Sequence, residues 1–230
     1  MEHLSNIELY YTSSELIESD RLILTSDELH HSVDVMRNTV GATIFVTDGK
    51  GSIFTSKITS ISVNHLAANI IERREYENKA HKIWFCIPIL KNPDRLKFAF
   101  EKCVELGITN FILFNSRHTL SKKVKPEKFQ KTMLAAMKQS LRAFFPQILV
   151  SNFDDILNFD GGKILFDQNA NKKFEGKLDF SKPTYFLFGP EGGFDKTELE
   201  SVSQENRFSL TENRLRSETA IINCASLLKI

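Results

Sequence analysis

From residue 81 onward, short apolar runs alternate with stretches of helical periodicity, and this alternation limits the possible folds more than any other feature of the chain. The apolar runs predict strands over residues 83–90, 108–114, 147–150, 163–166, 184–188 and 207–210. Helices are predicted between and after them, over residues 93–106, 125–145, 153–157, 196–205 and 217–228. Strands that alternate with helices form a parallel sheet covered by helices on both faces, so this part predicts an α/β domain.

Residues 1–75 have a different hydrophobic pattern, which predicts a small β-barrel. Their β-branched and aromatic stretches predict strands over residues 7–11, 21–24, 42–47, 52–58 and 66–71. Asp48 and Gly49 between two of these strands indicate a hairpin, because this pair tolerates positive φ. One helix is expected over residues 25–36, with Ser26 as N-cap and an apolar face of Leu29, Val33 and Met36. A barrel of this size usually binds a partner on its outside.

The charged segment 72–79 predicts a boundary between two domains, residues 1–74 and 75–230. The net charge of +1 conceals a strong asymmetry along the chain. Residues 1–78 carry a balance of −6, residues 79–150 one of +10, and residues 151–230 one of −3. Much of the positive charge forms one stripe on the helix predicted over 125–145, namely Lys128, Lys131, Lys138 and Arg142. This stripe favours a polyanionic partner, and lysines kept for solubility are the alternative.

Several classes of protein are disfavoured by what the sequence lacks. It has no apolar run of roughly 20 residues for a membrane helix, and residues 1–5 do not begin a signal peptide. Cys86, Cys103 and Cys224 are odd in number and lack the spacing of a metal site or a disulfide framework. We therefore expect a cytoplasmic protein that binds no metal. Dinucleotide, P-loop, nucleophile-elbow and zinc-protease motifs are also absent.

Two turns in the last third of the sequence carry the candidate chemistry. The first is Gly-Pro-Glu-Gly-Gly at residues 189–193, directly after an apolar run, where bare backbone groups can approach a ligand. The second precedes the last helix and holds Arg214, Arg216 and Glu218, with Ser217 as candidate N-cap. Cations that crowd an electropositive helix start favour anion binding. A tight strand-to-helix turn and a plain helix cap are the structural alternatives.

Together these turns resemble the C-terminal signature of the SPOUT methyltransferases, and among them the ribosomal RNA small subunit methyltransferase E (RsmE) family. Three further stretches agree with that family in chain order: Val35 to Gly41 before Asp48-Gly49, Lys91 to Arg95 with Glu101 to Gly107, and Lys138 to Arg142. The resemblance covers essentially the whole chain. It implies a PUA-like RNA-binding barrel over residues 1–74 and an α/β domain with a trefoil knot over residues 75–230.

The resemblance also implies an activity and its residues. Members of the family act as homodimers that use S-adenosylmethionine to methylate N3 of a uridine in 16S ribosomal RNA of the small subunit. Carried over to this chain, the donor would contact Leu165, Phe166, Phe188, Gly189, Glu191, Gly192, Leu210 and Leu215. The residues nearest methyl transfer would be Arg214, Arg216 and Glu218. The RNA-contact candidates are Arg37, Lys91, Arg95, Lys138, Gln139 and Arg142.

The expected chemistry gives the charged residues distinct roles. Arg214 or Arg216 would stabilise the uridine anion, and Glu218 or Glu191 would be the base. Thr211 stands where the family usually has glycine, so its side chain could crowd the adenine. Two alternatives stay open at this point. One is a PUA-type RNA-binding protein with an inactive knot domain, and the other is an unknotted α/β enzyme for a small phosphorylated ligand.

Overall fold

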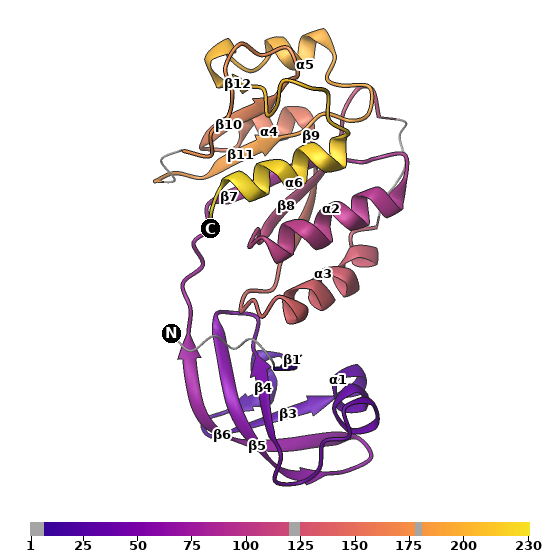
Figure 1. Ribbon diagram of the computed structural model, residues 1–230, viewed down its shortest axis with the longest axis vertical. Coiled ribbons are helices and arrows are strands. Elements are labelled where there is room, and N and C mark those ends of the chain that lie inside the picture. The colour runs from indigo at the N-terminus through magenta and orange to yellow at the C-terminus, as the bar shows by residue number, and fades with distance from the viewer. Residues whose placement is uncertain (1–6, 120–124, 178–180) are drawn as a thin grey trace. The chain divides into compact units, whose positions relative to one another are not determined.

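The computed structural model describes residues 7–119, 125–177 and 181–230. Residues 1–5, on which the absence of a signal peptide was predicted, lie outside these ranges. The chain forms two compact units, the first of residues 1–78 with 137–145 and the second of residues 79–136 with 146–230 (Figure 1). Within the described residues, no helix is long and apolar enough to cross a membrane.

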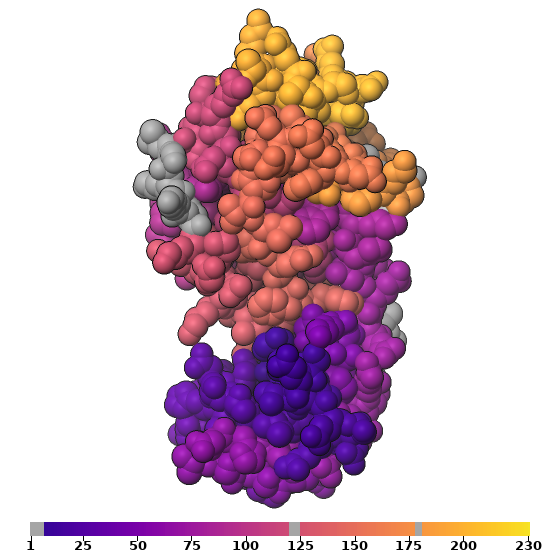
Figure 2. All heavy atoms as spheres, turned by 180° about the vertical axis from the view of Figure 1, so that it is seen from behind, coloured from indigo at the N-terminus to yellow at the C-terminus, as the bar shows by residue number. Residues whose placement is uncertain are grey.

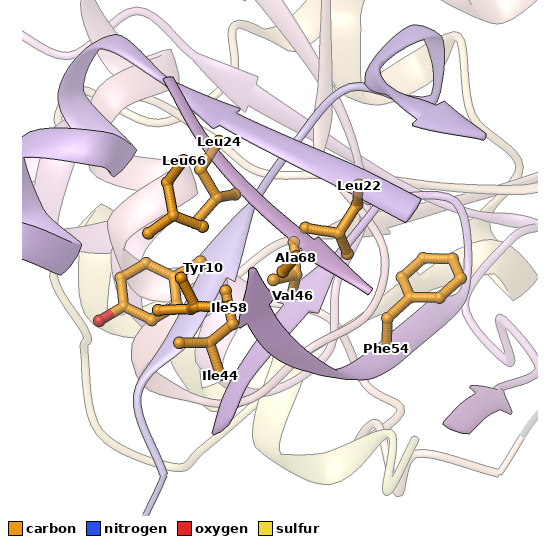
Figure 3. Close-up of a cluster of buried hydrophobic side chains, with 9 residues drawn as sticks. All are labelled: Tyr10, Leu22, Leu24, Ile44, Val46, Phe54, Ile58, Leu66 and Ala68. Carbon is orange, nitrogen blue, oxygen red and sulfur yellow. The ribbon is translucent and has the colours of Figure 1, made fainter. Parts of the chain in front are cut away.

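The first unit is built on a six-stranded sheet with the strand order β1-β4-β5-β6-β3-β2. Its strands are β1 (Leu9–Tyr11), β2 (Ile17–Glu18), β3 (Arg21–Thr25), β4 (Thr43–Thr47), β5 (Ser52–Ile61) and β6 (His65–Glu75), and η1 (Ser14–Leu16) follows β1. All neighbouring pairs are antiparallel except β1 with β4. Side chains from five of these strands converge on one apolar cluster, which includes Tyr10, Leu22, Val46 and Ile58 (Figure 3).

The helical segment after β3 departs from the sequence prediction at its N-cap and in its last turn. It consists of α1 (Ser26–His30) followed by one turn of wider helix, η2 (His31–Val35). Thr25 is the N-cap residue and Ser26 has φ of 50°, so the prediction of Ser26 as cap was wrong. Leu29 and Val33 pack on the core as predicted, whereas Met36 is 46% exposed because the widened turn carries it past the apolar face.

The predicted hairpin is confirmed. Strands β4 and β5 are joined through Asp48 to Gly51, and the Asp48 carboxylate accepts hydrogen bonds from the N–H groups of Lys50 and Ser52. Gly49 has φ of +67°, the conformation for which the Asp-Gly pair was singled out. The Gly49 carbonyl accepts a hydrogen bond from the Phe145 N–H, which attaches residues 140–145 to this turn.

That attachment explains why helix α3 (Glu127–Gln139) is shorter than predicted. The sequence pattern extended it to residue 145, but Leu141 has φ of +56° and the chain leaves the helix there. Ala143 then packs with Leu9 and Ile53 in a small apolar cluster. The predicted apolar face of α3 is correct over its length, since Phe129, Met133, Ala136 and Met137 are all buried.

The second unit is a wholly parallel six-stranded sheet with the order β12-β10-β11-β7-β8-β9, as the alternating pattern predicted. The strands are β7 (Ile83–Pro88), β8 (Asn110–Asn115), β9 (Gln147–Asn152), β10 (Gly162–Phe166), β11 (Thr184–Leu187) and β12 (Arg207–Phe208). After β9 the chain first forms β10 and then inserts β11 between β10 and β7. The segments from β10 to β12, orange to yellow-orange in Figure 2, therefore lie next to one another.

Helices and caps complete this unit. The helices are α2 (Pro93–Glu105), α4 (Phe153–Asn158), α5 (Lys196–Glu200) and α6 (Ser217–Leu227), with the short turn η3 (Gln204–Asn206). Asn92 caps α2 by accepting a hydrogen bond from the Asp94 N–H, and Gly107 follows the helix with φ of +96°, both as predicted. Helix α2 packs against α6 (Figure 1). The helix predicted over residues 196–205 is split into α5 and η3.

Candidate active site

The carboxyl ends of β10, β11 and β12 open into one cavity of about 680 Å³. Parallel sheets bind ligands at such strand ends, and most readily where the strand order changes direction, as it does around β11. The stacked rings of Phe166 and Phe188, with centroids 5.0 Å apart, form part of its wall. The loop after each of the three strands contributes polar lining, which includes Gln168, Glu191 and Arg214.

The glycine-rich turn after β11 brings backbone into this wall. A Cβ atom at Gly189 would stand 3.3 Å from the Phe194 ring, and one at Gly192 would stand 3.5 Å from the His118 side chain. Gly193 adopts φ of +75° and donates its N–H to the Pro190 carbonyl, which closes the turn. Gly189 therefore leaves room for the Phe194 ring, and the positive φ of Gly193 is a conformation that favours glycine.

A buried carboxylate connects the loop after β8 to the segment that follows this turn. Glu198 of α5 is 4% exposed and accepts hydrogen bonds from the Ser116 hydroxyl at 2.9 Å, the Arg117 N–H at 2.9 Å and the Asp195 N–H at 3.0 Å. The loop after β8 is thus attached to α5, and the Nδ1 atom of His118 lies 3.1 Å from the Gly193 carbonyl. Sequence reasoning missed Glu198 and His118, although the Asp195 and Glu198 spacing is that of a capping box.

The two turns singled out in the sequence are directly bonded to each other. The Ser217 hydroxyl donates a hydrogen bond to the Gly189 carbonyl at 2.7 Å. Ser217 is the first residue of α6 and Arg216 occupies the N-cap position without a side-chain cap bond, so the prediction of Ser217 as N-cap was wrong. Its hydroxyl joins two loops rather than capping a helix, because the Gly189 carbonyl lies within reach at the start of α6.

A charged pair lies at the edge of the cavity. Arg95, in the first turn of α2, lines the cavity, and its Nε atom is 3.6 Å from the Oε1 atom of Glu218. The Glu218 side chain is 10% exposed, and its Oε2 atom is buried without a hydrogen-bond partner. Glu218 does not itself line the cavity.

Most of the residues expected at the donor site meet in this cavity. Its lining includes Phe166, Phe188, Gly189, Glu191, Gly192, Leu210, Arg214, Leu215 and Arg216. Leu165 is fully buried in the core on the other side of its strand, because successive strand residues face opposite ways. Glu218 stands behind Arg95, as described above.

The six RNA-contact candidates are dispersed. Arg95 lines the cavity, and the Lys91 N–H donates to the Glu191 carboxylate at 3.0 Å. In the first unit, the Lys138 ammonium is 2.6 Å from the Glu28 carboxylate, and burial lowers the pKa of the Arg142 guanidinium. The remaining candidates are the exposed side chain of Gln139 and Arg37, whose φ is +56°.

The loop after β10 supplies cavity residues that sequence reasoning missed, namely Asp167, Gln168 and Asn169. Gln168 donates from its amide to the carbonyls of Thr211 and Glu212, at 3.4 and 3.2 Å, and so bridges the loops after β10 and β12. A run of amide and carboxylate side chains directly after an apolar strand was the available signal. Thr211 lines the cavity, and its hydroxyl donates to the Asn213 carbonyl at 2.6 Å.

Comparison with known proteins relates this geometry to a family. Residues 77–229 match the model of the RNA methyltransferase domain, and residues 24–71 match that of the RNA methyltransferase PUA domain. The chain is 32% identical to ribosomal RNA small subunit methyltransferase E of Mesomycoplasma hyopneumoniae, over 69% of this chain and 74% of that protein. It belongs to the ribosomal RNA small subunit methyltransferase E family.

Two further comparisons cover nearly the whole chain. The family member from Rickettsia conorii is 28% identical over 96% of this chain and 94% of its own length. A crystal structure of the Neisseria gonorrhoeae member, bound to S-adenosyl methionine, has a TM-score of 0.84 and 24% identity, over 96% of this chain and 95% of that chain. These matches establish the two-part fold of the family, with a PUA-like N-terminal part and an α/β methyltransferase part.

Among the described residues, no group of three or more histidine, cysteine, aspartate or glutamate side chains could hold a metal ion.

Proposed function

We propose that this chain is an S-adenosylmethionine-dependent methyltransferase that modifies N3 of a uridine in 16S ribosomal RNA of the small ribosomal subunit. The observation that carries the proposal is the cavity at the ends of β10, β11 and β12, with two bonded turns and three arginines in its wall. The family members named above are ribosomal RNA small subunit methyltransferases, and the one from Neisseria gonorrhoeae is bound to S-adenosyl methionine. We place the reaction in the cytoplasm.

The residues present fit the methyl donor. Leu210 and Leu215 line the cavity and offer apolar surface for an adenine ring, and the backbone of Gly189 and Gly192 in the same wall offers hydrogen-bonding groups. The Glu191 carboxylate can accept hydrogen bonds from hydroxyl or ammonium groups, while the Lys91 N–H holds one of its oxygens. Thr211 is directed by its bond to Asn213 and borders the same space.

When bound, S-adenosylmethionine supplies a methyl group on a sulfonium: the bond from N3 to carbon forms as the carbon–sulfur bond breaks, the sulfur keeps the electron pair, and the N3 proton passes to a base. The protein stabilises the uracil anion that loss of this proton creates, and exposed Arg214 and Arg216 are positioned in the cavity wall for it. We assign the base to Glu191, whose carboxylate lines the cavity. Alignment of N3 with the methyl group is the larger contribution.

The uridine must be unstacked to enter the cavity, which suits a loop or junction in RNA. We propose that residues 1–74 form the RNA-binding domain and residues 75–230 the methyltransferase domain, and that residues 137–145 fold with the former. Arg37, Lys91, Gln139 and Arg142 are the proposed RNA contacts, with Arg95 at the cavity. Lys138 would join them by exchanging the Glu28 carboxylate for a phosphate.

Two architectural features belong to the same proposal. A trefoil knot is supported by the insertion of β11 beside β7 and by the loop after β10, where a Cβ atom at Gly176 would stand 2.1 Å from the Leu227 carbonyl of α6. A homodimer is supported by α6 itself, because Ile221 and Cys224 are buried while Ile222 and Leu227 are only half-buried.

The test of this function is a nucleoside analysis. Small ribosomal subunits that lack the modification are incubated with the protein and S-adenosylmethionine labelled in the methyl group, and the RNA is digested to nucleosides. The expected labelled product is 3-methyluridine, and any other methylated nucleoside contradicts the substrate assignment. Calorimetry with S-adenosylmethionine addresses the alternative of an inactive knot: RNA binding without measurable donor binding would identify the chain as an RNA-binding protein only.

A further inference from the structure

Glu218 has three structural features that a role as general base does not explain. It is buried on the first turn of α6, one of its carboxylate oxygens faces the Arg95 guanidinium, and the other has no hydrogen-bond partner. Neither the cavity nor the solvent reaches that second oxygen, because it is buried and the residue is outside the cavity lining. A base must lie within hydrogen-bonding distance of the proton that it removes.

We propose that Arg95 is a catalytic residue of this site, whose guanidinium binds the uracil ring, and that Glu218 is the positioning residue that holds it there. This inference rests on the proposed function and changes two roles that the sequence predicted. Arg95 moves from the RNA surface to the reacting base, and Glu218 moves from candidate base to support for Arg95.

The helix that carries Arg95 gives a reason to expect function there. Asn92 caps α2 and Pro93 follows it, so Arg95 stands in the first turn. A cation in the first turn is unfavourable, because the helix dipole is positive at that end. Glu218 stands in the first turn of α6, where a carboxylate is favourable, and α2 packs against α6. The Glu218 carboxylate therefore offsets the unfavourable interaction between Arg95 and the α2 dipole, and a cation is kept at the cavity.

The chemistry of the guanidinium matches the demand of the reaction. Arginine has five N–H donors in a rigid fork and can bind a carboxylate through two of them. Engagement of both Glu218 oxygens would satisfy the buried Oε2 atom and leave three donors for the substrate. Removal of the N3 proton leaves a uracil anion whose charge is shared with the ring oxygens on either side of N3. Donors aimed at those oxygens stabilise the anion in the way that oxyanion holes do.

Among the described residues, Arg95 is also the one cavity-lining arginine with a carboxylate partner. Arg214 and Arg216 lie on an exposed loop, whereas Arg95 is attached to a thirteen-residue helix and to the buried carboxylate. A preorganised cation loses less freedom when the anion forms, so Arg95 is better placed to stabilise the transition state than the two loop arginines.

The test uses the full chain and the labelled-subunit assay, with the variants Arg95→Ala, Arg95→Lys, Glu218→Gln and the double variant Arg95→Ala with Glu218→Gln. The matched control is Lys102→Ala on the same helix, where the ammonium pairs with Glu101 and Glu105. Thermal denaturation and calorimetry with S-adenosylmethionine check that each variant folds and binds the donor. The control should leave activity unchanged.

We expect Arg95→Ala to lower kcat by about 100- to 1,000-fold, as the loss of a donor to a developing anion does. Arg95→Lys should recover part of this loss. Glu218→Gln, which misplaces the arginine, should lower kcat by about 10- to 100-fold. Donor affinity and the shape of the pH profile should not change in Glu218→Gln, and the double variant should be no slower than Arg95→Ala.

A Glu218→Gln variant whose pH profile loses its acidic limb would identify Glu218 as the base and overturn the inference. Losses that multiply in the double variant would overturn it as well, because the two residues would then act independently. An Arg95→Ala variant that keeps the kcat of the wild type would also overturn the inference. Failure of the proposed function is a separate outcome, since in that case the wild-type chain itself makes no 3-methyluridine.

Discussion

Replacement of Ser217 by alanine tests whether the two turns of the cavity act as one unit. The Ser217 hydroxyl donates to the Gly189 carbonyl at 2.7 Å, and the serine is 8% exposed. Alanine removes the donor and leaves the carbonyl without that partner, which costs about 1–3 kcal/mol when the site is buried. Because Gly189 is half-buried, water can replace part of the bond, and we expect a loss of about 1.5 kcal/mol.

Two expected measurements follow from that loss of free energy. The melting temperature should fall by about 3–6 °C in a domain of this size. Binding of S-adenosylmethionine should weaken by about five- to tenfold, because the donor must then order a turn that the hydroxyl orders in the wild type. Differential scanning calorimetry and isothermal titration calorimetry give the two values.

Two controls make the result interpretable. Ser217→Thr keeps the hydroxyl and should stay within about 0.5 kcal/mol of the wild type. Thr219→Ala removes an exposed hydroxyl from the same helical turn and should leave donor affinity unchanged. If Ser217→Ala melts and binds the donor like the wild type, the bond between the turns has no part in forming the site.

Three further predictions concern a close contact, an acid-sensitive cap and a half-buried ion pair. Gly176→Ala should lower stability by more than about 3 kcal/mol, because its Cβ would stand 2.1 Å from the Leu227 carbonyl. Gly193 has the same φ of +75° as Gly176, but a Cβ atom there would have nothing within 4 Å. Gly193→Ala should therefore lower the free energy of unfolding, measured by urea denaturation, by only about 1–2 kcal/mol. The hydrogen bond from the Glu198 N–H holds the pKa of the Asp195 carboxyl below its ordinary value of 3.8. The stability that this bond contributes is therefore present above pH 3.8 and is lost as the pH falls through the lower pKa of the folded state. Asp195→Asn should flatten this acid-side loss in thermal melts, and an unchanged slope would contradict it. Lys138→Ala should lower the melting temperature, because its ammonium pairs with Glu28, and should reduce the slope of the salt dependence of RNA binding by about 0.7–0.9, as the loss of one phosphate contact does. Lys128→Ala, at an exposed position of the same helix, should reduce that slope by about 0.7–0.9.

Features that depend on near neighbours along the chain could be predicted from the amino-acid sequence. The period of the apolar runs predicted every strand of the parallel sheet, and Asn92, Pro93 and Gly107 marked the ends of α2. The hairpin at Asp48 and Gly49 followed from local backbone preference. Such features can be predicted because caps, turns and apolar periods depend on residues that are a few positions apart.

Features that depend on distant partners follow from the folded structure and could not be predicted from local patterns. Helix α3 ends at Gln139 because residues 140–145 bond to the turn at Gly49, which no local pattern in the helix indicates. Ser217 joins Gly189 across 28 positions, and Glu218 meets Arg95 from a separate helix. In each case a contact between remote segments outweighs a local preference of about 1 kcal/mol. The roles of individual charges in the cavity are therefore set by the fold, while the sequence motifs indicate only that the cavity exists.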